Sequence, residues 1–382
     1  TGVKNTLIGG LAGDAITDAD SNVAVGQEAL STNTLGSRSV AIGTAALFTQ
    51  NFTTATNADN TAVGHFAGGS ITTGQVNVVI GSLAGDALTD ADYNVAIGTY
   101  ALSSDTLGSK STALGHNTLY TQNFTTATDS HNTAVGFQAG LAVTTGVNNT
   151  LIGAIAGDAL NTGLQNTAVG KGALSSDTKG SASTAIGRAA LETQNFTTAT
   201  DVFNTAVGYA AGEAVTTGIQ NTLIGAAAGD ALTDADFNVA VGYGALSTDT
   251  LGSRSVAIGR NALLSQNFTT ATSSNNTAVG YETGRNTTTG IDNTLYGSNA
   301  GYAITDADAN TAVGRSALAT NILGSNNTAI GYNALNEANP ATAVVTHNTA
   351  VGWQAGLKVG TGISNTLIGS EAGDALTNTN DN

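Results

Sequence analysis

Clustered carboxylates are the residues of this chain best suited to bind a metal ion. The segment Thr-Asp-Ala-Asp occurs at 17–20, 89–92, 233–236 and 305–308, and three of these copies have another Asp four residues before the first of the pair. Such a density of oxygen atoms suits Ca²⁺, which takes about 6–8 oxygen ligands. The candidate calcium ligands are Asp14, Asp18, Asp20, Asp86, Asp90, Asp92, Asp230, Asp234 and Asp236.

The same acidic segments have a simpler interpretation as solvated turns. Asp is favoured in turns because its carboxylate hydrogen-bonds to nearby backbone. The corresponding segment at 160–165 reads Leu-Asn-Thr-Gly-Leu-Gln, and the Asp spacing matches neither an EF-hand nor the glycine-rich calcium repeat. Both interpretations stay open, and no cofactor other than Ca²⁺ is a candidate.

Four Asn-x-Thr sequences form a second set of candidate sites, for N-glycosylation. Each opens a segment of the type Asn-Phe-Thr-Thr-Ala-Thr, and in a fifth copy Pro340 replaces the Phe. The alternative is a Thr-rich turn whose Phe packs on the protein. The candidate acceptors are Asn51, Asn123, Asn195 and Asn267.

The sequence contains no arrangement of residues typical of catalysis. The four His, at 65, 116, 131 and 347, have no metal-ligand spacing, and no Gly-x-Ser-x-Gly sequence occurs. The glycine-rich segments recur at a fixed period, which indicates corners of a repeat rather than phosphate-binding loops. We therefore expect that the protein is not an enzyme and has no catalytic residues.

Composition narrows the fold class and the partners. The chain has 49 Gly, 1 Pro and no Cys, and only 10% of its 382 residues are charged. This is too much Gly for a helical protein and too little charge for a disordered one. The net charge of −16 makes nucleic acid an unsuitable partner. No apolar run approaches the ~20 residues of a membrane-spanning helix, so direct membrane insertion is not expected.

A five-residue unit, Asn/Ser–Thr/Val–Ala/Leu–Val/Ile–Gly, recurs 21 times. Its Gly positions follow one another at steps of 17, 17, 17 and 21, which gives a larger period of 72. The super-repeats are 1–72, 73–144, 145–216, 217–288, 289–360 and the partial 361–382. The four extra residues of every fourth unit predict a loop on one face. Regular repetition from end to end predicts one continuous domain, 1–382.

The spacing predicts an all-β fold: a parallel β-solenoid, or β-roll, with one coil per Gly and a coil length of 17 or 21. In 60–64 the side chains of Thr61 and Val63 lie on one face of a strand and Ala62 on the other. We expect the Val or Ile that precedes the Gly in every coil except those of Leu114 and Tyr296 to form a buried apolar ladder, so Val63→Asp is predicted to unfold the local coils. Asn is expected to form a hydrogen-bonded ladder at a corner. The predicted ladder residues are Asn60, Val63, Gly64, Asn132, Val135, Gly136, Asn204, Val207 and Gly208.

Several units resemble those of known repeat families. Asn-Val-Ala-Ile-Gly at 94–98 and Ser-Val-Ala-Ile-Gly at 39–43 and 255–259 resemble the head repeats of trimeric autotransporter adhesins. The run at 327–335 is similar to repeats of bacterial and phage tail-fibre-domain proteins. The resemblance covers the whole chain, but only one short motif per coil, and the coils here are longer. It implies a left-handed parallel β-roll in which three chains associate side by side.

These observations predict a non-enzymatic structural fibre or adhesin shaft on a cell or virion surface, outside the cell. We expect the chain to be a stretch of a longer filament that self-associates as a homotrimer, with a surface glycan or cell-surface receptor as a candidate partner. Two alternatives remain: an ice-binding solenoid, because of Thr pairs such as Thr53–Thr54, and a calcium-dependent glycan-binding module.

Overall fold

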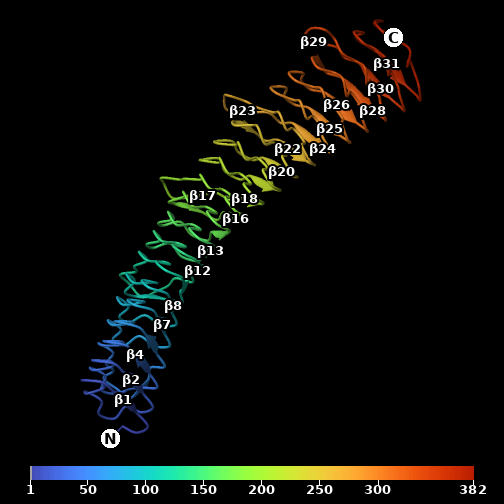
Figure 1. Cartoon of the computed structure of the whole chain (residues 1–382). Helices are drawn as coiled ribbons and strands as arrows, with labels where there is room; N and C mark the ends of the chain where they lie inside the picture. The colour runs from blue at the N-terminus through green and yellow to red at the C-terminus, as the bar shows by residue number, and fades with distance from the viewer. Residues whose placement is uncertain (1) are drawn as a thin grey trace. The chain divides into compact units, whose positions relative to one another are not determined.

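The computed structural model describes residues 2–382 and consists of two compact units, each built from stacked parallel coils (Figure 1). Among the described residues, unit 1 comprises 2–188 and 195–201, and unit 2 comprises 189–194 and 202–382. Thr1, the first residue of super-repeat 1–72, lies outside the described residues. The predicted all-β solenoid is confirmed: among the described residues no segment is helical, and so none is a helix able to span a membrane.

Each coil contributes one strand of three residues. In unit 1 these strands are β1 (Thr6–Ile8), β2 (Val23–Val25), β4 (Val40–Ile42), β6 (Thr61–Val63), β7 (Val78–Ile80), β8 (Val95–Ile97), β10 (Thr112–Leu114), β12 (Thr133–Val135), β13 (Thr150–Ile152), β14 (Thr167–Val169) and β16 (Thr184–Ile186). In unit 2 they are β18 (Thr205–Val207), β19 (Thr222–Ile224), β20 (Val239–Val241), β22 (Val256–Ile258), β24 (Thr277–Val279), β25 (Thr294–Tyr296), β26 (Thr311–Val313), β28 (Thr328–Ile330), β30 (Thr349–Val351) and β31 (Thr366–Ile368).

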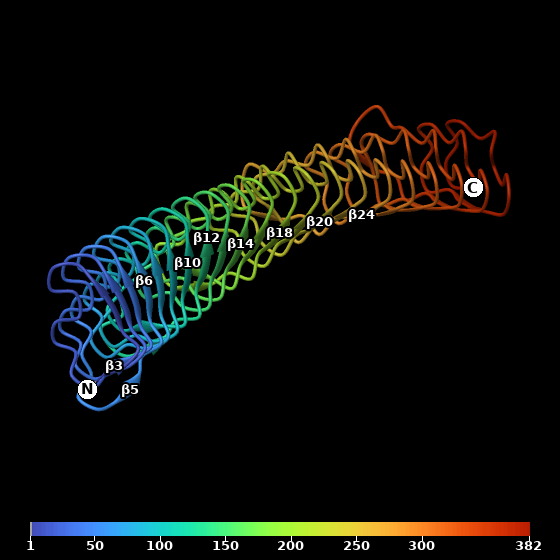
Figure 2. The same ribbon diagram turned by 60° about the horizontal axis from the view of Figure 1, so that its bottom comes forward.

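Within each unit, neighbouring strands pair in parallel and in the register of the sequence repeat. Ala62 of β6 is paired with Val79 of β7, one short step of the repeat later. Ala41 of β4 is paired with Ala62, one long step later, and this longer step contains the loop that the four extra residues predict. Figure 2 shows the coils of each unit stacked one on the next.

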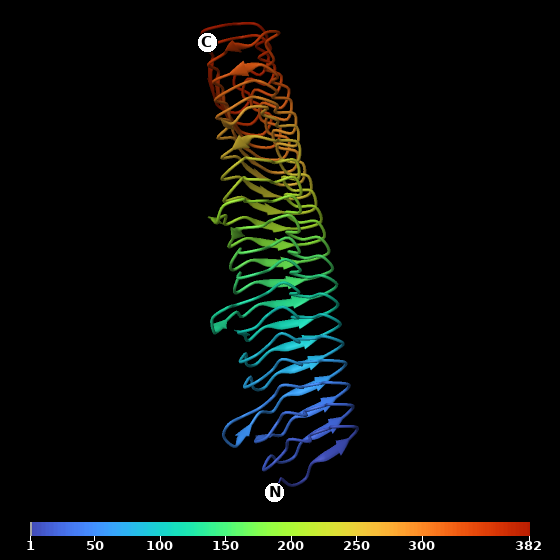
Figure 3. The ribbon, with the colours of Figure 1, turned by 90° about the vertical axis from the view of Figure 1, so that its left-hand side faces the viewer.

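The longer coils also form short strand pairs outside the main ladder. In unit 1 these pairs are β3 (Gly36–Ser37) with β5 (Thr56–Asn57), β9 (Gly108–Ser109) with β11 (Thr128–Asp129), and β15 (Gly180–Ser181) with β17 (Thr200–Asp201). In unit 2 they are β21 (Gly252–Ser253) with β23 (Thr272–Ser273), and β27 (Gly324–Ser325) with β29 (Val344–Val345). In Figure 3 the loops that carry β5 and β11 extend to one side of unit 1.

The strands bury the face opposite to the one predicted. Ala62 in the middle of β6 is fully buried, whereas Val63 is only half-buried, and the same holds for Val135 and Val207. The predicted buried Val/Ile ladder is therefore wrong in its orientation, although the ladder itself is in register. The physical reason is space: the interior of a coil is narrow, and it is already occupied by larger side chains from the turns.

Large and small residues alternate inside the coils so that the core is filled. Leu151 of β13 is fully buried and lies over Gly140 and Gly157, which belong to its own coil and the preceding one. A Cβ atom added to Gly140 would lie 2.8 Å from Leu151 Cδ1 and 2.9 Å from Leu119 Cδ2. In the second and third coils of each complete super-repeat the strand carries Ala, as at Ala113, and the same position after the corner is a buried Leu, here Leu119. Close packing of this kind admits a larger inward residue, such as Val79 or Leu151, only in coils whose turn carries Gly at this position, such as Gly85 or Gly157.

The corners are held by stacked Asn and Gly residues, as predicted. Asn132 is fully buried; its Nδ2 donates to Gly146 O at 2.7 Å, and its Oδ1 accepts from the backbone N–H of Asn149 at 2.9 Å. Asn60 and Asn204 make the same contacts with their neighbours. Gly136 has a φ of 137°, and a Cβ there would lie 2.5 Å from Gly153 O, so only Gly fits this corner.

Candidate functional site

The carboxylates of the acidic segments hydrogen-bond to the coil that precedes them. In unit 1, Asp92 Oδ1 accepts from the backbone N–H of Gln75 at 2.7 Å, and Asp90 Oδ1 accepts from Thr73 Oγ1. Asp20 Oδ1 accepts from the N–H of Val3 at 2.7 Å. In unit 2, Asp236 Oδ1 and Asp234 Oδ1 accept from the Ile219 N–H and the Thr217 hydroxyl. These contacts are those expected of a turn that joins successive coils.

The structure does not gather the candidate calcium ligands into one site. Among residues 2–382, no three His, Asp or Glu side chains lie close enough together to hold a metal ion. Asp14, Asp18 and Asp20 are exposed along a single turn. Carboxylates already engaged with backbone N–H groups are also less available as ligands. Calcium binding therefore stays a prediction, to be tested with metal and chelator.

Three Asp side chains that precede the turns are set apart by burial. Asp86, Asp158 and Asp230 occupy equivalent positions in the sequence repeat, and the Oδ1 atom of each is buried without a hydrogen-bond partner. Burial raises the pKa of each of these carboxyls, and the hydrogen bond from the residue's own backbone opposes the rise only in part. Asp158 belongs to the super-repeat that lacks Thr-Asp-Ala-Asp, so this burial does not depend on that segment.

The candidate glycosylation sites lie at the start of the long loops. Asn51, Asn123 and Asn195 are exposed and Asn267 is half-buried. The Oδ1 of Asn123 accepts from Thr106 Oγ1 at 3.0 Å, and the other three make the equivalent contact. The Phe that follows each Asn is buried, as the alternative interpretation expects. Both a structural role and glycosylation are compatible with an exposed Asn in this position.

A buried Asp or Asn side chain supports each long loop, and sequence reasoning missed it. Asp105 is fully buried; its Oδ1 accepts from the N–H groups of Gly108 and Phe124 at 3.0 and 3.1 Å, and its Oδ2 accepts from Gln122 Nε2 at 2.6 Å. Gln122 Oε1 accepts from Asn132 Nδ2 at 2.9 Å, which links the loop to the corner ladder. The available signal was the Gln that precedes all four Asn-Phe-Thr segments.

The outward face of the strand ladder carries a column of apolar side chains in both units. Its column of Val and Ile side chains is half-buried to exposed, for example Ile152 and Ile186 in unit 1 and Ile258 and Ile330 in unit 2, each 37–39% exposed. Beside it runs a second column, made by the first residue of each strand, which is Thr or Val. Apart from Leu114 in unit 1 and Tyr296 in unit 2, each unit thus presents a strip of β-branched side chains in register.

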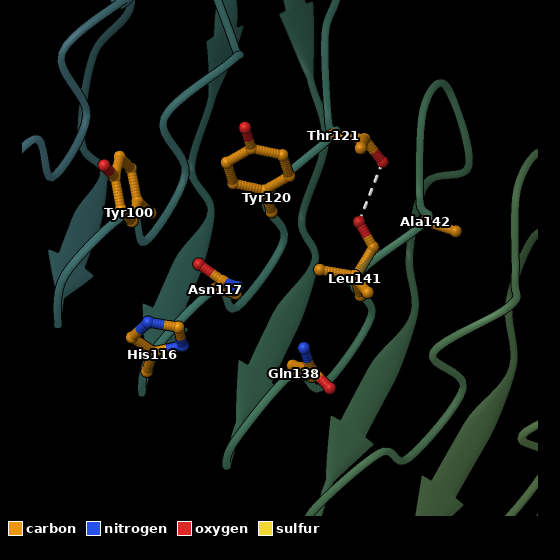
Figure 4. Close-up of a pocket in the computed structure, with 8 residues that line it drawn as sticks. All are labelled: Tyr100, His116, Asn117, Tyr120, Thr121, Gln138, Leu141 and Ala142. Atoms are coloured by element: carbon orange, nitrogen blue, oxygen red, sulfur yellow. Dashed lines mark hydrogen bonds between the residues drawn. The ribbon is translucent and has the colours of Figure 1, made fainter.

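A hollow of about 510 Å³ lies on unit 1 beside the coils that contain β8, β10 and β12. Tyr100, His116 and Tyr120 surround it, together with the amide side chains of Asn117 and Gln138 (Figure 4). The rings of Tyr100 and Tyr120 meet edge to face at a centroid distance of 6.1 Å, and His116 stacks on Phe137 at 5.7 Å. Of the four His of the chain, only His116 lines this hollow, and no sequence pattern distinguishes it from the others.

Most residues of one column of unit 2, directly after the corner Gly, are aromatic or Arg. The Arg260 guanidinium lies 5.9 Å from the ring centroid of Tyr243 and 5.7 Å from that of Tyr281. Farther along, Tyr332 stacks on Trp353 at 6.4 Å. Cation–π contacts of this kind are each worth about 0.5–1 kcal/mol at an exposed site, so they order these side chains on the surface.

A search of protein-family models finds no match to this chain, and comparison with curated proteins finds no similar sequence. The resemblance to adhesin and tail-fibre repeats therefore stays a hypothesis that rests on the short motif alone. The proposed function rests on the fold.

Proposed function

We propose that this protein is a non-enzymatic shaft of an extracellular fibre or adhesin on a cell or virion surface, formed by three chains packed side by side. The observation that supports this most is the outward strip of Val and Ile. A regular column of half-exposed β-branched side chains is an unusual surface for a chain that remains alone in water, because contiguous apolar patches mark association sites.

The geometry of the strip suits association between identical chains. It follows the strand ladder, so its residues repeat at each coil, and a second copy can meet it along many coils at once. Each added coil contributes the same small contact, and the contacts sum as they do between neighbouring repeats. The super-repeat gives such a shaft a regular pattern of loops, since the long loop recurs once in four coils.

The mass in solution tests the shaft proposal. Light scattering coupled to gel filtration should give three times the chain mass of 37.6 kDa. Ile152→Lys with Ile186→Lys should lower the mass to that of one chain, because charges on the strip oppose its burial. Thr126→Lys, on an exposed loop of the same unit, is the control and should leave the mass unchanged. A wild-type monomer at micromolar concentration would refute the proposal.

Ice binding is a second candidate, favoured by the Thr column of unit 2. Six consecutive strands begin with Thr, and these residues pair in register from Thr277 through Thr294, Thr311, Thr328 and Thr349 to Thr366. This Thr array lies on the strand face, whereas the Thr pairs that first suggested ice binding, such as Thr53–Thr54, lie in the long loops. Thermal hysteresis at micromolar protein, shown by a monomer, would place this function above the shaft.

A further inference from the structure

We propose that the hollow on unit 1 binds the ring of a neutral hexopyranose, as part of an oligosaccharide, between Tyr100, His116 and Tyr120. This proposal goes beyond the shaft and does not depend on a trimer. The hollow is within the size range of ligand pockets, about 300–1,000 Å³. Its aromatic rings offer flat apolar surface, and its amides and hydroxyls offer hydrogen bonds, which together match the two kinds of surface of a sugar ring.

The polar groups of the hollow are free to bind a ligand. Neither the hydroxyls of Tyr100 and Tyr120 nor the side-chain amide of Gln138 hydrogen-bonds to another described residue. Asn117 Oδ1 also has no partner, but it is buried from solvent, so Tyr100, Tyr120 and Gln138 are the groups that a ligand can reach. Figure 4 shows the two Tyr and His116 grouped around Asn117, with Gln138 at the opposite border. A sugar hydroxyl seated among these groups would meet both donors and acceptors.

The repeat does not require these residues, which argues that they have another role. In the first super-repeat the positions of Tyr100, His116, Asn117 and Tyr120 are occupied by Glu28, Thr44, Ala45 and Phe48. In the third they are Gly172, Arg188, Ala189 and Glu192. Coils of the same design thus fold with quite different side chains here. The aromatic set is a local departure from the repeat and not a consequence of it.

The backbone holds the set in place before any ligand arrives. Tyr100, Asn117 and Gln138 occupy equivalent positions in three successive coils, all with φ of 55–59°. The N–H of Asn117 donates to Thr99 O at 3.1 Å, and that of Gln138 donates to His116 O at 3.0 Å. Thr121 Oγ1 donates to Leu141 O at 2.8 Å at the border of the hollow (Figure 4). A fixed platform reduces the entropy lost on binding.

Charge selects a neutral ligand over an acidic one. No Lys or Arg lines the hollow, so an acidic sugar would find no strong partner there. The chain as a whole carries a net charge of −16, which repels anions. No carboxylate lines the hollow either, so binding at this place does not require calcium, in contrast to a site built from the acidic turns.

An oligosaccharide array tests the proposal on the full chain. Immobilised lactose, N-acetyllactosamine and cellobiose are compared with their sialylated or sulfated forms, and the best neutral binder is then titrated by calorimetry. Tyr100→Ala and Tyr120→Ala should each weaken binding at least fivefold. Gln138→Leu, which keeps the size of the side chain, should weaken it as well. Tyr93→Ala removes another exposed Tyr of unit 1 and should have no effect.

The outcomes decide between the possible occupants. Neutral binding that survives chelator and is lost in Tyr100→Ala with Tyr120→Ala supports the proposal. Binding only of the acidic forms, binding lost in chelator, or no binding at all overturns it. A lower mass of the assembly in the Tyr variants would show that a second copy occupies the hollow, and would also overturn it. Since the shaft is tested by mass and the hollow by sugar binding, the two proposals can fail separately.

Discussion

The alternation of Leu and Gly in the core predicts a strong coupling between Gly140 and Leu151. Leu151→Ala removes a fully buried side chain and should destabilise the protein by about 3 kcal/mol, through lost burial and the cavity left behind. The cavity opens directly beside Gly140, because the missing Leu151 Cδ1 is the atom that a Cβ on Gly140 would meet at 2.8 Å.

Gly140→Ala is destabilising for two reasons. Its φ of 61° is a left-handed conformation, which costs a residue with Cβ about 1–2 kcal/mol. Reduced entropy of the unfolded chain offsets about 0.4–1 kcal/mol of this. The new methyl also lies too close to Leu151 and Leu119, and overpacking of a core costs about 1–3 kcal/mol. The expected total is about 2–3 kcal/mol.

The double variant should be more stable than the sum of the two single changes predicts. The methyl introduced at position 140 then occupies part of the cavity, and one of its two clashes is gone. We expect a coupling energy of about 1–2 kcal/mol, measured by urea denaturation followed by circular dichroism at one fixed chain concentration.

A matched control makes the Leu→Ala change at the equivalent position of unit 2. Leu223 is fully buried and lies over Gly212 in unit 2, as Leu151 lies over Gly140. Gly140→Ala combined with Leu223→Ala should therefore be additive to within about 0.3–0.5 kcal/mol. Additivity of Gly140→Ala with Leu151→Ala as well would refute the interpretation of the core as interlocking large and small residues.

Three further predictions follow from burial and hydrogen bonding. Ala62→Asp should unfold the local coils, because it places a charge in the core. Val63→Asp should leave the circular dichroism unchanged and weaken only the association of chains. The reverse result would show that Val63, and not Ala62, is the buried residue. Asn132→Ala should lower the free energy of unfolding by about 2–4 kcal/mol, because it leaves several buried groups unpaired, Gly146 O among them. Urea denaturation measures this change. A loss far below the ~1 kcal/mol of one typical hydrogen bond would contradict the prediction. Burial raises the pKa of the Asp86 carboxyl above its ordinary value of 3.8. The protonated Asp86 carboxyl contributes its full share of the folding stability at pH values below the ordinary pKa. This contribution is lost as the pH rises through the raised pKa of the folded state. Asp86→Asn should therefore raise the melting temperature more at pH 7 than at pH 4, and an equal rise at both would show that the charge is not the cause.

The sequence by itself determined the period, the strands and the corners. Gly at the regular short and long steps sets the register, because only Gly fits a corner such as that of Gly136, where the next coil leaves no space for a Cβ. Asn at a constant distance before it determines the polar ladder, because a buried amide must find partners in the neighbouring coils. The alternation of side chains across a strand is also local, and it was predicted for Thr61, Ala62 and Val63.

Which face is buried was decided only by the tertiary structure. Val63 is more apolar than Ala62, so a strand considered alone buries Val. Inside the folded coil, however, the inner position shares its space with side chains from the turns and from the neighbouring coils, such as Leu119, so most coils place Ala there. Val79 and Leu151 lie inward in coils whose turn carries Gly instead of Leu. The hollow of unit 1 was likewise decided only by the tertiary structure. Tyr100, Tyr120 and Gln138 belong to three successive coils and are distant in the sequence, and they meet because the stacking of coils places equivalent turns side by side.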